Sequence, residues 1–227
     1  MPHSRHERAL RREGFHAIAG VDEAGRGALF GPVFAAAVVL DPEKPIRGLD
    51  DSKALEPERR EVLAKRIRER ARGWAVAAAD AFEIDRINIL QASRLAMRRA
   101  VERLAGACDH LLVDAVTVDV PLPQKALIHG DALCFSIAAA SILAKVHRDH
   151  ALRHWDRVFP AYGLASNKGY STPDHIAALE KLGPTALHRF SFEPVRLSSH
   201  IEFWTGYPSI VQQTELFERQ TEVLPCH

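Results

Sequence analysis

Short apolar runs alternate with longer amphipathic stretches along most of the chain. The apolar runs have the length and composition of buried strands, and they cover residues 16–21, 33–40, 74–79, 110–114 and 126–129. The amphipathic stretches repeat apolar side chains at helical spacing, and they cover residues 56–72, 84–104, 132–159 and 172–182. Strands that alternate with helices predict an α/β fold in which helices cover a sheet.

A glycine-rich segment, Asp22–Pro32, separates the first two predicted strands. Its glycines indicate a turn rather than a continuation of the strand. Neighbouring residues of a regular strand point to opposite faces, so Asp22 and Glu23 can face one site only if the chain bends there. We therefore expect the turn Ala24–Gly27 to bend the chain at once, so that the longer Glu23 side chain can reach the site.

Composition narrows the class of protein only slightly. The 227 residues are 47% hydrophobic and 26% charged with a net charge of +1, which is typical of one large globular domain. Cys108, Cys134 and Cys226 are too few and too scattered for a disulfide framework or a cysteine-rich zinc site. No run is apolar enough for a secretion signal or a membrane span, so we expect a cytoplasmic protein.

The two ends of the chain differ from its middle. Residues 1–12 carry four arginines and one glutamate, a basic arm that is more often a solvated tail than a phosphate contact. From Leu197 the periodic pattern loosens and becomes aromatic. We expect residues 1–196 to form the main domain and residues 197–227 to form an extension whose role the pattern does not predict.

Four carboxylates fall where strands end or a helix begins. Asp22 and Glu23 follow the first strand, Asp114 closes the fourth, and Asp131 opens the long helix. Ligand sites of α/β sheets form at strand ends, and clustered carboxylates repel one another unless cations neutralise them. Hard oxygen ligands suit Mg²⁺ or Mn²⁺, and two such ions could promote hydrolysis of a phosphodiester.

Each carboxylate also has a simpler interpretation. Asp22 could cap a turn, Glu23 could be a solvated charge, and Asp131 is well placed as a helix N-cap. Asp114 is harder to explain without a partner, because burying an unpaired acid at the end of an apolar strand is costly.

The order of the motifs resembles the ribonuclease HII family. The match runs from about residue 18 to residue 195 and includes Gly20–Gly27 (GVDEAGRG), Asp51–Lys53 (DSK), Ile87–Ala92 (INILQA), Gly130–Asp131, Ser136–Lys145, Arg148–Asp149, Asn167–Tyr170 (NKGY), His175 and His188–Phe192. The resemblance implies a ribonuclease H-like fold, a mixed five-stranded sheet flanked by helices, with a helical C-terminal region.

The resemblance also implies chemistry. Asp22, Glu23, Asp114 and Asp131 would be the catalytic, metal-binding acids, working with Mg²⁺ or Mn²⁺, two ions during catalysis. The substrates would be RNA–DNA hybrids and DNA duplexes containing single ribonucleotides. Cleavage would occur on the 5′ side of a ribonucleotide and leave a 3′ hydroxyl, and the enzyme would act as a monomer in the bacterial cytoplasm.

Eight further residues would bind substrate by the same resemblance. Gly25, Arg26 and Gly27 would read the 2′ hydroxyl, and Tyr170 would stack on the sugar of the next deoxynucleotide. Phosphate contacts are expected from Lys53, Lys145, Arg148 and Lys168, although isolated charges are more often solvated. The chain departs from the family pattern at Ala28, Ala115 and His129, where Pro, Gly and Lys are usual.

Two other functional classes remain open at this stage. A nuclease of the same fold could act on DNA alone, or a nucleic-acid-binding module could have lost catalysis. The Gly25–Gly27 segment and Tyr170 favour an enzyme that senses a 2′ hydroxyl, and the presence of all four carboxylates favours catalysis.

Overall fold

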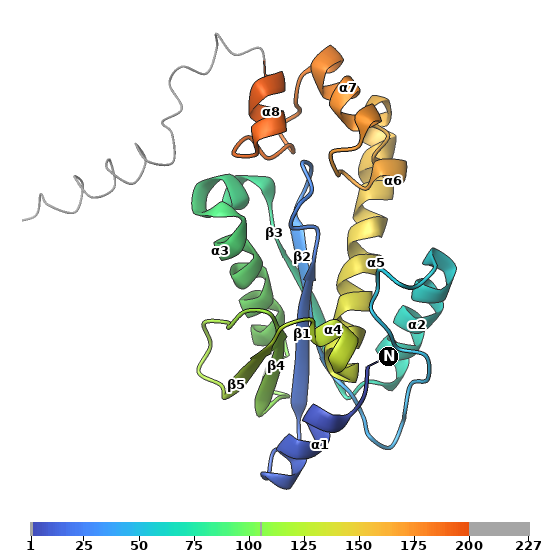
Figure 1. The fold of residues 1–227 in the computed structure, drawn as a ribbon, viewed down its shortest axis with the longest axis vertical. Coiled ribbons are helices and arrows are strands. Elements are labelled where there is room, and N and C mark those ends of the chain that lie inside the picture. The colour runs from blue at the N-terminus through green and yellow to red at the C-terminus, as the bar shows by residue number, and fades with distance from the viewer. Residues whose placement is uncertain (1, 105, 200–227) are drawn as a thin grey trace, which may run out of the picture.

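A mixed five-stranded sheet forms the centre of the protein, as expected. The computed structural model describes residues 2–104 and 106–199. The strands are β1 (Ile18–Ala24), β2 (Val33–Val39), β3 (Gly73–Ala79), β4 (His110–Asp114) and β5 (Gln124–Leu127), in the order β3-β2-β1-β4-β5 (Figure 1). β1–β2 and β2–β3 pair antiparallel, whereas β1–β4 and β4–β5 pair parallel.

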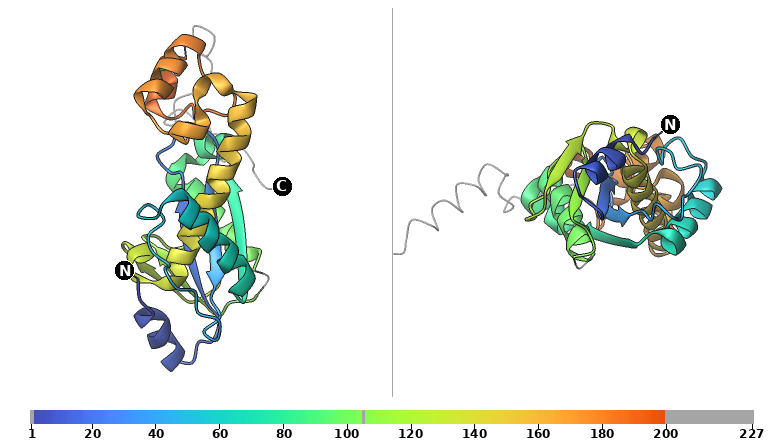
Figure 2. Two further views of the ribbon diagram at one scale, coloured as in Figure 1. Left: turned by 90° about the vertical axis from the view of Figure 1, so that its right-hand side faces the viewer. Right: turned by 90° about the horizontal axis from the view of Figure 1, so that it is seen from below.

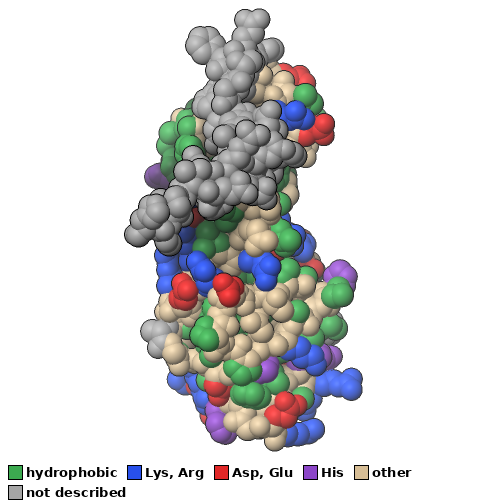
Figure 3. Space-filling model, turned by 90° about the vertical axis from the view of Figure 1, so that its left-hand side faces the viewer, with side chains coloured by type: hydrophobic (Ala, Val, Ile, Leu, Met, Phe, Trp, Pro, Cys, Tyr) green, Lys and Arg blue, Asp and Glu red, His purple; other side chains and the backbone are tan. Residues whose placement is uncertain are grey.

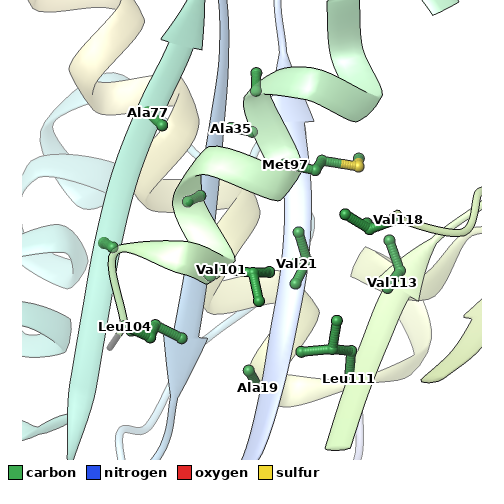
Figure 4. Close-up of a cluster of buried hydrophobic side chains, with 14 of the residues drawn as sticks. Ala19, Val21, Ala35, Ala77, Met97, Val101, Leu104, Leu111, Val113 and Val118 are labelled. Atoms are coloured by element: carbon green, nitrogen blue, oxygen red, sulfur yellow. The ribbon is translucent and has the colours of Figure 1, made fainter. Parts of the chain in front are cut away.

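Helices cover both faces of this sheet because its strands are apolar on both sides. Helix α3 (Ala81–Glu102) packs on one face, and α2 (Pro57–Arg70) and α5 (Phe135–Val158) pack on the other (Figure 2). Successive strand residues alternate between the faces, so Val21 and Val113 join Met97 and Val101 of α3 in one core (Figure 4). The next residues of those strands, Asp22 and Asp114, therefore point toward α5.

Helix α5 lies unusually close to β1. A Cβ atom on Gly20 would lie 2.0 Å from the carbonyl carbon of Ser136, so only glycine fits at this position. This contact places the first turns of α5 against the strand residues that immediately precede Asp22.

The first strand extends beyond its predicted end at Val21. β1 continues to Ala24, and Asp22, Glu23 and Ala24 pair with Ala36, Ala35 and Phe34 of β2. Ladder pairing carries the strand to the first glycine, and the turn begins only at Gly25, where φ is +95°.

Two further predictions need correction. The long helix begins at Phe135, with Cys134 as its N-cap, and Asp131 lies instead in the first turn of a separate short helix, α4 (Gly130–Leu133). Helix α3 contains a break at Asn88, where φ is +66°, and the side chain of that asparagine accepts a hydrogen bond from the Gln91 amide at 3.1 Å.

The basic N-terminal arm is a helix rather than a solvated tail. Helix α1 (Arg5–Arg12) packs at the end of the molecule opposite to α7 (Figures 1 and 2). The buried Glu7 carboxylate accepts hydrogen bonds from the amide and the hydroxyl of Ser136, both at 2.9 Å. Glu7 therefore caps the first turn of α5 across the sequence.

A group of short helices follows α5: η1 (Pro160–Tyr162), α6 (Leu164–Asn167), α7 (Pro173–Leu182) and α8 (Glu193–Ser198). They pack around Leu29 and Phe30, which follow the glycine turn after β1. The helical C-terminal region is thus joined to the segment that carries Gly25–Gly27. Almost all of the predicted extension 197–227 lies outside the described residues, including its aromatic side chains.

No helix in residues 2–104 and 106–199 has both the length and the apolar character needed to cross a membrane.

Candidate active site

Asp22 and Asp114 meet at the carboxyl ends of two parallel strands. Val21 pairs with Val113, so the two acids follow side by side. Asp22 is only 4% exposed, and its pKa is raised well above the usual value by burial first, then by the charges of Glu23 and Asp114. Asp114 accepts a hydrogen bond from the Gly130 amide at 2.6 Å.

Glu23 reaches the same edge of the sheet although β1 continues past it to Ala24. Burial raises its pKa, Arg26 lowers it, and Asp114 raises it again. The Arg26 guanidinium lies 3.3 Å from the Glu23 carboxylate. Neighbouring residues of a regular strand point to opposite faces. The Glu23 side chain is longer than that of an aspartate, so its carboxylate can still reach the site.

Asp131 approaches from α4 and completes the set. Its carboxylate accepts a hydrogen bond from the Ala132 amide at 2.9 Å. Burial raises the pKa of Asp131, Asp51 and Asp114 raise it further, and Lys53 opposes them. The Lys53 ammonium lies 4.0 Å from the Asp131 carboxylate, and 82% of the lysine side chain is exposed.

Lys53 is the cation that responds most clearly to these acids. Partial burial alone would lower its pKa, but the carboxylates have the larger combined effect and raise it; they are Asp51, Asp131, Asp22 and Asp114. The exposed ammonium is therefore within electrostatic range of three of the four predicted catalytic acids.

Two buried serines support Asp22, and the sequence reasoning did not single them out. The hydroxyls of Ser52 and Ser141 lie 2.9 Å apart. A hydrogen bond from Ser141 lowers the pKa of Asp22, opposing part of the effect of burial. The available signal was that Ser52 belongs to the DSK motif and Ser141 interrupts the alanine-rich run of α5.

The donor chemistry of the acids fits a hard divalent cation. In the part of the chain that the structure describes, no three His, Cys, Asp or Glu side chains are arranged to hold one ion by themselves. Mg²⁺ does not require such a group, because it usually keeps several waters and takes one or two carboxylates together with substrate phosphates. The mutual repulsion that raises the pKa of Asp22 is what a bound cation would relieve.

The glycine turn and Tyr170 lie next to each other. A Cβ atom on Gly27 would lie 4.0 Å from Cε1 of Tyr170, and the Leu29 amide donates to the Gly169 oxygen at 2.7 Å. The Tyr170 side chain remains 37% exposed. An accessible aromatic ring therefore lies beside a turn in which Gly25 and Gly27 leave the backbone uncovered.

Arg148 lies behind this surface rather than on it. It is 1% exposed, its Nη2 donates to the Lys168 oxygen at 2.8 Å, and its guanidinium carbon lies 5.2 Å from the centre of the Tyr170 ring. A Cβ atom on Gly25 would collide with its Nε at 2.0 Å. This burial does not favour the expected phosphate contact and indicates a supporting role.

Arg189 is a second buried arginine that the sequence reasoning did not single out. It is 0% exposed and donates to the main-chain oxygens of Arg26 at 2.7 Å and Gly31 at 2.9 Å. It thus spans the glycine turn from the C-terminal region. The only signal in the sequence was its place in the motif His188–Phe192.

The two remaining predicted phosphate contacts have partners within the protein. The Lys145 ammonium lies 2.9 Å from the Asp149 carboxylate. The Lys168 ammonium donates to the Ala165 oxygen, and burial lowers its pKa. Neither lysine contacts the four acids in the described structure.

Two of the three departures from the family pattern have left-handed backbone conformations. Ala115 has φ +55° and His129 has φ +57°, in the left-handed region that glycine adopts at little cost. Both nevertheless keep Asp114 and the adjoining Gly130 in place, since their hydrogen bond is intact. Ala28 is fully buried beside the glycine turn.

A groove lies between α3 and the loop after β4. Its lining includes Gln91, Arg94, Arg98, Thr117 and Asp119. Figure 3 shows Lys and Arg side chains interspersed with Asp and Glu below the grey atoms on the face that it displays.

The comparisons with known proteins agree with the geometry. The ribonuclease HII family model matches residues 19–195. A ribonuclease HII of Solibacter usitatus strain Ellin6076 is 68% identical over 193 residues, covering 85% of each chain. The ribonuclease H2 from Pyrococcus horikoshii OT3 has a similar structure, with a TM-score of 0.69 and 27% identity over 81% of this chain and 97% of that one.

Bst ribonuclease HIII in complex with Mn²⁺ shares the fold, with a TM-score of 0.68 and 19% identity over 80% of this chain and 68% of that one. The family match spans the sheet, the four acids, the glycine turn and Tyr170. The chain therefore belongs to the ribonuclease HII family, metal-dependent endonucleases that cleave RNA in RNA–DNA hybrids.

Proposed function

We propose that this chain cuts on the 5′ side of ribonucleotides, including single ribonucleotides embedded in duplex DNA, with Asp22, Glu23, Asp114 and Asp131 as the catalytic acids. The main support is the burial of Asp22 beside Glu23 and Asp114, which raises its pKa well above the usual value. A water oxygen would attack phosphorus while the bond to the 3′ oxygen breaks. The products would be a 3′ hydroxyl and a 5′ phosphate.

The acids would hold Mg²⁺ or Mn²⁺, as the donor chemistry and the Mn²⁺ complex of Bst ribonuclease HIII support. When bound, two such ions can activate a water and stabilise the leaving oxygen. Ser141 keeps Asp22 oriented through its hydroxyl, and the Gly130 amide does the same for Asp114. The carboxylates are thus arranged before any substrate arrives.

The glycine turn and Tyr170 would supply the preference for a ribonucleotide followed by a deoxynucleotide. Gly25, Arg26 and Gly27 would contact the 2′ hydroxyl, the group that separates RNA from DNA. Tyr170 would stack on the following sugar, and its partial exposure beside Gly27 supports this role. Arg148 and Arg189 would hold these elements from behind rather than contact phosphate.

Phosphates of the substrate would be contacted by Lys53, Lys145 and Lys168. Lys53 is the best supported, because it is exposed and lies beside Asp131. Lys145 and Lys168 would have to exchange their present partners, Asp149 and Ala165, for phosphate oxygens. Such contacts position a nucleic acid but do not specify its sequence.

We further propose that residues 1–196 are the catalytic unit and that the enzyme acts as a monomer in the bacterial cytoplasm. The family match to residues 19–195 supports the first statement.

Incubation with a duplex containing one ribonucleotide tests the proposal. Wild-type protein should cut 5′ of the ribonucleotide only when Mg²⁺ or Mn²⁺ is present, and Asp22→Asn protein should not. Equal cutting of an all-DNA duplex would replace the proposal with a general nuclease. Binding without cutting in either metal would indicate a module that has lost catalysis.

A further inference from the structure

Two buried histidines lie directly behind Tyr170. His175, in the first turn of α7, and His188 are both 0% exposed, and their Nε2 atoms lie 3.2 Å apart. The rings of Phe30 and Tyr162 pack against His188, with centroids 4.9 and 5.0 Å away. Neither histidine takes part in the acid chemistry described above.

The hydrogen bonds around this pair define where its protons lie. The Thr185 amide donates to Nδ1 of His188 at 2.9 Å, so that nitrogen carries no proton and Nε2 does. His188 Nε2 then donates to Nε2 of His175, which leaves the proton of His175 on Nδ1. This Nδ1 donates to the main-chain oxygen of Tyr170 at 2.9 Å. The bonds form one directed chain from Thr185 to Tyr170.

This series of hydrogen bonds can form only while both histidine rings are neutral. A proton added to Nε2 of His175 would place two N–H groups against each other across 3.2 Å, and a proton added to Nδ1 of His188 would face the N–H of Thr185. Burial lowers the pKa of both histidines, and burial together with the charge of His175 lowers the pKa of His188 to about 3. The environment therefore keeps the arrangement in the neutral form.

The backbone that leads to Tyr170 needs such support. Lys168 and Gly169 are consecutive left-handed residues, with φ values of +53° and +73°. Such conformations persist where the surrounding structure holds them. Asn167 accepts from the Gly169 amide at 2.7 Å on one side, and His175 donates to Tyr170 on the other. The histidine bond is thus one of the contacts that set the direction of the tyrosine ring.

We infer that His175 and His188 are positioning residues that hold Tyr170 against the sugar following the ribonucleotide, and so set the preference for embedded ribonucleotides over long hybrids. The inference rests on the proposed contact of Tyr170 with that sugar. It adds a specificity role to residues that never touch the substrate.

The test compares kcat/KM for a duplex with one embedded ribonucleotide with kcat/KM for a long RNA–DNA hybrid. Tyr170→Ala should lower this ratio, and His175→Phe should lower it by about 10- to 100-fold, because a small misplacement of a positioning group has effects of this size. His175→Asn is the matched variant: its amide can still donate to Tyr170, so it should keep the ratio within about threefold of wild type.

The outcomes separate the two proposals. An unchanged ratio in Tyr170→Ala would overturn the role of Tyr170 itself. A lowered ratio in Tyr170→Ala with an unchanged ratio in His175→Phe would overturn only the positioning role of the two histidines. An equal fall on both substrates in His175→Phe would do the same, since it would indicate general loss of structure.

A second measurement needs no variant. Nitrogen-15 NMR of the wild-type protein at pH 7 should show His175 as the Nδ1–H tautomer and His188 as the Nε2–H tautomer. The opposite tautomer at His175, or a charged ring at either position, would contradict the chain of hydrogen bonds from Thr185 to Tyr170.

Discussion

Asp22 and Asp114 occupy the same level of two neighbouring parallel strands, because Val21 and Val113 pair immediately before them. Residues far apart in sequence are thereby fixed at one edge of the sheet by backbone pairing rather than by contacts between their side chains. Each acid also has a polar neighbour, Ser141 for Asp22 and the Gly130 amide for Asp114. The strand pairing therefore fixes both the proximity of the two carboxylates and the electrostatic repulsion between them.

Replacing Asp114 by Asn should abolish most activity without harming the fold. We expect cleavage to fall by about 10³-fold, the size of effect seen when a preorganised charge is lost. Without metal, thermal stability should be unchanged or higher, because a like charge beside Asp22 has been removed. Rates and melting temperatures check both statements. Asp119→Asn, whose side chain is 92% exposed, is the control and should resemble wild type.

Gly20→Ala should destabilise the protein severely. The new methyl group would lie 2.0 Å from the Ser136 backbone, which cannot move away as a flexible side chain could. We expect a loss of about 3 kcal/mol or more in the free energy of unfolding. Gly73→Ala, also in a strand, is the matched control, since its Cβ would meet the nearest atom at 3.6 Å. Urea denaturation of the two variants should differ clearly, and equal losses would refute the close approach.

Glu7 should contribute to stability as a cap of α5. Glu7→Ala removes the acceptor for the amide and hydroxyl of Ser136 and should cost about 1–2 kcal/mol. Glu7→Gln keeps an acceptor and should cost less. Glu13→Ala changes an exposed glutamate at the end of the same helix and should be nearly neutral. Thermal unfolding of the three variants would contradict the cap if Glu7→Ala matched Glu13→Ala.

His188 makes the stability of the protein depend on pH. Its pKa is lowered from 6.5 to about 3 by burial and by His175, so the unfolded chain binds a proton that the folded protein excludes. The contribution is fully present above pH 6.5 and is lost as the pH falls toward 3. The loss should approach about 1.4 kcal/mol for each pH unit in that window. Denaturation of wild type and His188→Gln from pH 7 to pH 4.5 measures it, and parallel curves would contradict a neutral buried histidine.

Much of the fold was predictable because its strands and helices have different hydrophobic periods. All five strands and the helices α2, α3, α5 and α7 lie within a few residues of their predicted positions. Strand ends were less predictable. β1 passes through Asp22 and Glu23 because β2 offers partners there, and this pairing is a tertiary effect that glycines later in the segment do not reveal.

The grouping of the acids near one edge of the sheet could be predicted from the strands that precede them, whereas the groups behind the glycine turn could not. Arg148 was predicted to contact phosphate and Arg189 was not singled out, and only the packed structure places them at 1% and 0% exposure. The same holds for Glu7, whose partner Ser136 is more than a hundred residues away. The final packing decides which distant residue forms a hydrogen bond with a buried polar group. No local pattern in the sequence therefore reveals such a partner.

The affinity of the purified protein for Mn²⁺, measured by isothermal titration calorimetry, tests the role of the acids most directly. Wild type and Asp119→Asn should bind with the same affinity, and Asp22→Asn should bind at least about 10-fold more weakly, because a carboxylate ligand has been lost. Equal affinity in wild type and Asp22→Asn would contradict a metal site built on these carboxylates.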